Sequence, residues 1–209
     1  FAEKNVKDIT YFGKSTSRDD LVKTGRFGVG FKSVFAFTAT PIIISGDEHF
    51  RIHGLYRVSE HPYPDGFSRI RTRIVLPFNH PTERPDYVED LMTPKEAYSK
   101  IAARLTGLNM NTLLFTRNVR EICWQIEGSS GHYLREDKPR DGTRVTTTIT
   151  AGSTLNRYLV FARIPTWHNQ QYKAVEIAFG LDDKDQIAPI QDSLYVLFAT
   201  KQETHLQFL

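Results

Sequence analysis

Hydrophobic positions along the chain follow two different spacings. Apolar side chains recur every three or four residues in 3–12, 31–37 and 93–107, a spacing that favours amphipathic helices. Elsewhere they form short β-branched and aromatic runs typical of strands, at 41–45, 50–58, 67–78, 112–116, 120–127, 143–150, 157–165, 173–181 and 193–200. The pattern predicts a first part that mixes helix and strand, and a second part that is nearly all strand from about residue 118.

The predicted helices have identifiable faces and ends. Val6 and Ile9 should point toward a core from the first helix, and the second should bury an apolar face formed by Phe31, Val34 and Phe35. The third begins with a capping box, in which Thr93 is the N-cap, Pro94 follows and Glu96 occupies the third helical position. Gly107 is suited to its C-terminal cap.

Composition narrows the class of protein without identifying it. The 209 residues carry a formal net charge of +3, far short of a nucleic-acid-binding tail, and no apolar run reaches the roughly 18 residues of a membrane helix. The single Cys123 excludes an internal disulfide and fits a reducing compartment. We therefore expect an intracellular, cytoplasmic protein with no membrane partner.

A glycine-rich stretch, GRFGVGFKSVF at 25–35, is the main candidate for chemistry. Glycines at 25, 28 and 30 would let the backbone approach a ligand, and N–H groups at the start of the following helix favour an anion such as phosphate. The stretch lacks the spacing of a P-loop, and no good strand precedes it as a dinucleotide-binding fingerprint requires. A glycine turn that serves packing alone remains the alternative.

The same stretch resembles the second glycine motif of the GHKL ATPase superfamily, in its chaperone-like branch. It is most similar to the sacsin-type and NO VEIN-type ATPase modules, where G-x-x-G-x-G-F-K-S-V-F precedes a P-x-I-x-S strand, here Pro41 to Ser45. GKST at 13–16 resembles the start of the ATP lid, TRIVLP at 72–77 a later family strand, and 194–208 a downstream sacsin-like segment.

The resemblance implies a fold and a site. The fold would be an α+β Bergerat-type sandwich, a mixed sheet with helices on one face, in residues 1–118, followed by a β-rich second domain in 119–209. The glycine loop would wrap the triphosphate, Lys14 could meet a phosphate at the lid base, and Thr72 would lie near the adenine, although Arg71 replaces the glycine usual before that threonine. The ATP-binding residues implied are Gly13, Lys14, Ser15, Thr16, Gly25, Arg26, Phe27, Gly28, Val29, Gly30, Phe31 and Thr72.

The superfamily's other motifs precede the lid, and Phe1 resembles the last residue of one of them. The catalytic Glu, the Mg²⁺-binding Asn and the adenine-reading Asp are accordingly expected upstream, so no catalytic residue is assigned here. Glu3 and Asp8 are weaker candidates for the base, with Asp19 and Asp20 to be considered only if this chain hydrolyses ATP by itself. The implied activity of the intact protein is Mg²⁺-dependent ATP hydrolysis coupled to conformational change, acting on a protein client or on partner domains.

Two other functions stay open. The chain could be a degenerate nucleotide-binding or protein-interaction module that never hydrolyses ATP, or a nucleic-acid-binding β domain. Arg69, Arg71 and Arg73 alternate along a predicted strand and are either a solvated face or a phosphate contact.

Several other polar residues have both a functional and a purely structural interpretation. His49 and His53 lack convincing metal spacing, so no metal ligand is assigned. Cys123 is predicted to be a core residue rather than a redox site. Lys173 or Lys201 could send a cation from the second domain to the γ-phosphate, or be ordinary surface lysines.

Overall fold

The computed structural model describes residues 6, 9–10, 30–116, 118–164, 166–167, 170–171, 175–190, 193–196, 198–203 and 209, with only the backbone course at 166–167, 170–171, 193–196 and 198–203. The chain divides into two compact units, 1–101 and 102–209. The division lies upstream of residue 118, where the sequence pattern changes. Among the described residues, the helices are too short and too polar to cross a bilayer.

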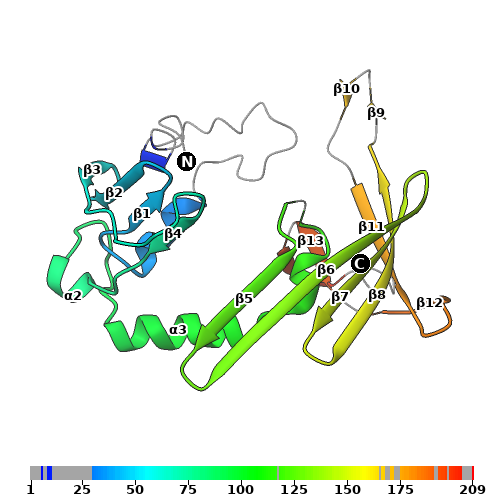
Figure 1. Ribbon diagram of the computed structural model, residues 1–209. Coiled ribbons are helices and arrows are strands. Elements are labelled where there is room, and N and C mark those ends of the chain that lie inside the picture. The colour runs from blue at the N-terminus through cyan, green and yellow to red at the C-terminus, as the bar shows by residue number, and fades with distance from the viewer. Residues whose placement is uncertain are drawn as a thin grey trace. The chain divides into compact units, whose positions relative to one another are not determined.

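The first unit is built on a four-stranded antiparallel sheet in the order β3-β2-β1-β4 (Figure 1). Its strands are β1 (Ile42–Ser45), β2 (Glu48–His53), β3 (Arg57–Glu60) and β4 (Thr72–Val75). Ile43 lies opposite Phe50 on one side and Ile74 on the other. The connections β1–β2 and β2–β3 are only a few residues long, which forces antiparallel pairing because a parallel pair needs a long crossover.

One face of this sheet buries the first core, formed by Phe35, Ile43, Phe50 and Ile52. Phe35 comes from the 3-10 helix η1 (Phe31–Ala36), whose Phe31 and Val34 also pack there. Val6 and Ile9 reach the same cluster. The predicted inward packing of Val6 and Ile9, and of Phe31, Val34 and Phe35, is thus confirmed.

Two α-helices follow the sheet, α2 (His80–Glu83) and α3 (Pro94–Thr106). The predicted capping box of α3 is confirmed. The backbone N–H of Thr93 donates to Glu96 Oε2 at 2.8 Å, and the N–H of Glu96 donates to Thr93 Oγ1 at 3.3 Å. The helix ends at Thr106, directly before Gly107, as expected.

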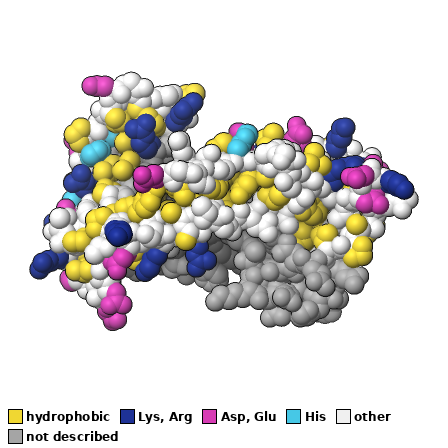
Figure 2. All heavy atoms as spheres, turned by 90° about the horizontal axis from the view of Figure 1, so that it is seen from below, with side chains coloured by type: hydrophobic (Ala, Val, Ile, Leu, Met, Phe, Trp, Pro, Cys, Tyr) yellow, Lys and Arg dark blue, Asp and Glu magenta, His cyan; other side chains and the backbone are white. Residues whose placement is uncertain are grey.

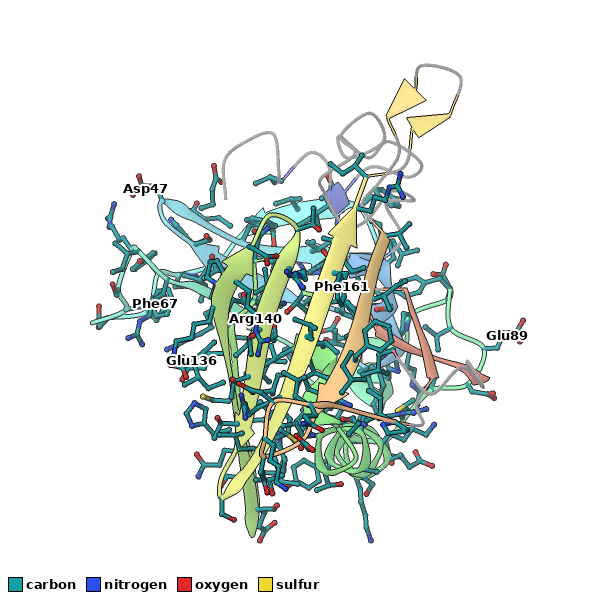
Figure 3. All side chains as sticks on the ribbon, turned by 90° about the vertical axis from the view of Figure 1, so that its right-hand side faces the viewer. Asp47, Phe67, Glu89, Glu136, Arg140 and Phe161 are labelled. Carbon is teal, nitrogen blue, oxygen red and sulfur yellow. The ribbon has the colours of Figure 1, made fainter. Side chains whose placement is uncertain are left out.

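The second unit is built on a six-stranded antiparallel sheet in the order β12-β11-β8-β7-β6-β5. Its strands are β5 (Glu121–Ile126), β6 (Ser129–Asp141), β7 (Arg144–Ala151), β8 (Thr154–Arg163), β11 (Val175–Leu181) and β12 (Ile187–Ala188). Figure 3 looks onto this sheet, with Glu136 and Arg140 labelled on β6 and Phe161 on β8. Two separate strand pairs complete the unit, β9 (Thr166–Trp167) with β10 (Gln170–Gln171), and β13 (Ser193–Val196) with β14 (Phe198–Glu203).

The core of the second unit forms where the segment around η2 (Met110–Leu113) packs on the sheet. Leu113 and Leu114 are fully buried there beside Ile149, Tyr158 and Ala178. Hydrogen bonds also hold this segment to β6. Arg135 Nη1 donates to the carbonyl oxygens of Leu113 and Thr116 at 3.0 and 2.6 Å.

The predicted Bergerat-type α/β sandwich is wrong. The described strand pairs are all antiparallel, so the first sheet is not mixed, and no layer of helices covers a face of it in the described residues. Residues 31–36 form a short 3-10 helix. The apolar residues that follow lie in antiparallel hairpins with short connections. The described residues fold instead as two β-rich units with few helices.

Candidate functional site

Most of the predicted ATP-binding residues lie outside the described part of the chain. These are Gly13, Lys14, Ser15, Thr16, Gly25, Arg26, Phe27, Gly28 and Val29. Glu3, Asp8, Asp19, Asp20 and Lys173 also lie outside it, as does the side chain of Lys201. The described candidates are Gly30, Phe31 and Thr72, all in the first unit.

Gly30 is exposed and caps the N-terminus of η1 in ordinary right-handed helical geometry, with φ −56° and ψ −49°. A Cβ built on it meets no described atom within 4 Å. The other described glycines either have a positive φ or would bring a Cβ within 3.2 Å of a neighbour. Neither backbone geometry nor packing within the described residues therefore requires glycine at position 30.

The residues after Gly30 are held firmly to the sheet. Phe35 is buried and packs edge-to-face against Phe31 and Tyr87, with ring centroids 6.5 and 5.8 Å apart. Lys32 Nζ donates to the carbonyl oxygen of Leu55 at 2.5 Å, and burial lowers the pKa of this lysine. Leu55 has φ 73°, an uncommon conformation for a side chain other than glycine.

A second anchor comes from Asn79 and His80, which the sequence analysis did not identify. The Asn79 side chain accepts from the Ala39 N–H at 2.9 Å and donates to Thr40 Oγ1 at 2.7 Å. His80 is fully buried, with Nε2 3.1 Å from the Phe35 carbonyl oxygen and Nδ1 3.4 Å from the Met92 nitrogen. These contacts fix the chain where it leaves η1. In the sequence, the only sign of this anchor is the pair of polar residues in FNHP at 78–81.

Thr72 begins β4, and its hydroxyl lies 2.6 Å from Ser45 Oγ. Ser45 and Ile43 are two residues apart on β1 and therefore share a face of the sheet. Ile43 packs in the core with Phe35 of η1. The Thr72 hydroxyl consequently points to the side of the sheet that carries η1. Its suggested role near adenine stays a prediction.

The predicted arginine face does not form as one strand face. Only Arg73 belongs to β4, because Arg69 and Arg71 precede it. Arg69 forms an ion pair with Asp47 and lies over the Tyr63 ring, 5.5 Å from its centroid, and Arg73 lies over Phe67 at 4.5 Å. Figure 3 labels Asp47 and Phe67 in this region. Two of the three cations therefore have partners within the chain.

The histidines at 49 and 53 have separate partners. His49 Nδ1 contacts the His61 carbonyl oxygen, and His53 Nε2 lies 2.9 Å from Ser59 Oγ. Partial burial, together with the charges of Arg57 and Arg51, lowers the pKa of His53.

Cys123 is exposed, so the expectation of a core residue is wrong at that position. It lies on β5 beside Glu121, and His132 of β6 lies opposite. Desolvation and the Glu121 carboxylate raise the pKa of the Cys123 thiol, which disfavours an activated nucleophile.

Comparison with known proteins gives a match to the N-terminal quarter of the chain. The Sacsin domain family matches residues 1–53, which include the whole glycine motif. Human Sacsin is 42% identical over 48 residues, which cover 23% of this chain and 1% of the length of Sacsin. No solved structure matches the chain. The N-terminal part of the chain is thus similar to a Sacsin domain.

Proposed function

We propose that this chain binds ATP through the glycine-rich segment 25–30, as part of a chaperone-like ATPase of the GHKL superfamily. The single observation that carries the proposal is the unexplained glycine at the end of the motif. Gly30 is exposed, has helical φ and ψ, and a Cβ built on it would meet no atom of the described residues within 4 Å. A phosphate group that approaches the backbone closely would explain why no side chain stands there.

Two further observations support the proposal. The similarity to the Sacsin domain falls on the segment that contains the motif. The residues after Gly30 are anchored by a buried aromatic side chain, by the contact of His80 with the Phe35 carbonyl oxygen, and by the hydrogen bond that the Ala39 N–H donates to Asn79. A rigid support of this kind suits a loop that must hold its N–H groups in place for a ligand.

In the proposed site the chain's own residues bind and orient the nucleotide. Backbone N–H groups of Gly28 and Gly30 would donate to phosphate oxygens, with Lys14 as a further cation and Thr72 near the base. Bound Mg²⁺ would supply neutralisation of charge on the triphosphate. The catalytic base and the Mg²⁺ ligands stay unassigned.

The test is nucleotide binding by the intact protein, measured by titration with a non-hydrolysable ATP analogue in the presence of Mg²⁺. We expect Gly28→Val and Gly30→Val to abolish binding while the variants remain folded by circular dichroism. Unchanged affinity in a folded Gly30→Val variant would show that the glycine motif does not contact phosphate. Turnover of ATP, measured in parallel, separates an ATPase from a nucleotide-binding module without hydrolysis.

The nucleic-acid alternative has less support. Arg69 and Arg73 are engaged by Asp47 and by aromatic rings, and Figure 2 shows cationic and acidic side chains interspersed with hydrophobic ones on the face it presents. Binding to nucleic acid would weaken steeply with salt because counterions are released. A flat salt dependence, or no binding, would remove this alternative.

A further inference from the structure

A cluster of three potential metal ligands lies on the exposed face of the β5–β6 hairpin. Glu121 and Cys123 are two residues apart on β5 and therefore share a face. Cys123 lies directly opposite His132 of β6 in the strand register. The ligand atoms of all three side chains lie within 4.8 Å of one another.

Of two distances between these atoms, one fits a shared metal ion, and the other is that of a hydrogen-bonded ion pair. His132 Nε2 is 2.7 Å from Glu121 Oε1, and Cys123 Sγ is 3.7 Å from the same oxygen. Zinc bonds of about 2.0–2.3 Å in tetrahedral geometry place neighbouring ligand atoms roughly 3.3–3.8 Å apart. Rotations of the exposed side chains that lengthen the contact between His132 Nε2 and Glu121 Oε1 would bring the three atoms into a coordination shell, with the Cys123 Sγ spacing already suitable.

The chemistry of the three donors selects the class of metal. A thiolate, an imidazole nitrogen and a carboxylate oxygen are the ligand types that Zn²⁺ takes in proteins, whereas Mg²⁺ and Ca²⁺ prefer oxygen alone. Cys123 and His132 also line an open surface pocket with Ser130, Thr150 and Gly152. That pocket leaves space for water or another small ligand at a fourth position.

The hairpin itself holds the arrangement. Gly128, with φ 73°, forms the tight turn that sets the register of β5 against β6. On the opposite face, Trp124 packs over Gly131, whose added Cβ would come within 2.3 Å of the indole. The side of the hairpin away from the cluster is therefore fixed by packing, and the ligand-bearing side is free to adjust.

We propose that Glu121, Cys123 and His132 form a binding site for Zn²⁺, with water completing the coordination. Binding takes place by loss of the thiol proton, so no oxidant or reductant is needed. All three residues belong to the second unit, whereas the glycine motif belongs to the first.

The experiment titrates the reduced full chain with Zn²⁺ by calorimetry, and with Co²⁺ as a spectroscopic probe. We expect one equivalent to bind, with a thiolate-to-cobalt charge-transfer band. Cys123→Ser and His132→Gln should each weaken Zn²⁺ binding by at least about 100-fold, above the 10–100-fold typical of losing an outer-shell partner. Glu121→Gln should weaken it as well. Circular dichroism checks that each exposed substitution leaves the fold intact.

His53→Gln is the matched control, because it removes a histidine from the other unit. It should leave the Zn²⁺ affinity unchanged. Three results would overturn the proposal: no Zn²⁺ binding by the wild-type chain, the same affinity in Cys123→Ser, or an equal loss in His53→Gln.

Discussion

At Asp137, burial and hydrogen bonding act on the carboxyl group in opposite directions. Burial alone would raise its pKa, but hydrogen bonds from Arg135, Thr147 and Arg120 outweigh it and lower the pKa below the usual range. Arg135 Nε and Thr147 Oγ1 donate to the same oxygen at 2.9 and 2.8 Å. The ionised form is therefore favoured by folding.

This linkage predicts an acid-dependent loss of stability. A depressed folded pKa contributes stability that is complete above the unfolded pKa of about 3.9 and disappears as pH falls through the folded value. Asp137→Asn should lower the unfolding free energy at pH 7 by about 1.5–3 kcal/mol, the range for hydrogen bonds to a charged group. Urea unfolding at pH 7 and pH 3 checks this. The unfolding free energy lost in Asp137→Asn must be smaller at pH 3 than at pH 7. An equal cost at both values would show that charge is not involved.

Glycines at 30 and 131 should respond oppositely to the same substitution. Gly30 has helical geometry, and a Cβ there would meet no atom of the described residues within 4 Å, so Gly30→Ala should raise the unfolding free energy by about 0.4–1 kcal/mol. Gly131→Ala places a Cβ against the Trp124 indole and should cost about 1–3 kcal/mol. Chemical denaturation measures both changes. A destabilised Gly30→Ala variant would indicate that packing, and no ligand, requires this glycine.

At single positions the sequence predicts chemistry well only when the partners are near in the chain. The Thr93–Glu96 capping box could be predicted because its two residues are three apart. The cluster at Cys123 could not, because His132 meets it only through the register of a hairpin whose second strand was not predicted.

Among the elements, η1 provides the sharpest test of packing. Phe35→Ala removes a buried ring that contacts Phe31 and Tyr87, and should cost about 3–5 kcal/mol of unfolding free energy. Tyr56→Ala is the control in the same unit, since Tyr56 is 68% exposed and should change the unfolding free energy by less than about 0.5 kcal/mol. Equal losses in the two variants would mean that the buried face of η1 is wrongly assigned.

Two elements show why spacing alone misassigns structure. TLLFT at 112–116 was predicted as a strand, but Leu113 and Leu114 are both fully buried at consecutive positions, as a 3-10 turn on a sheet allows. The side chain of Asn109 caps that turn by accepting from the Asn111 N–H at 2.8 Å. Strand β6 was missed because its inward-facing positions include Arg135 and Asp137, which are charged but hydrogen-bonded to each other.

At the scale of the whole molecule, the order of strand-rich segments was largely visible in the sequence, but the sheet arrangement was not. The expectation that helices cover one face of a mixed sheet rested on the resemblance to the GHKL superfamily. The short connections between strands of the first unit instead produce antiparallel hairpins. The two proposed sites fall in different units, with the glycine motif in the first and the zinc ligands in the second. Each can therefore be removed by substitutions that do not touch the other.

The most direct measurement of the central claim is ATP-analogue affinity in the intact protein and its Gly30→Ala variant, with Mg²⁺ present, alongside the unfolding free energy of both. The proposed contact predicts weaker nucleotide binding, at least tenfold or about 1.4 kcal/mol, in a variant that is as stable as the wild type or more so. Gly131→Ala should keep the wild-type affinity in its folded state. An unchanged affinity in stable Gly30→Ala, or no nucleotide binding by the wild-type protein, would contradict the account.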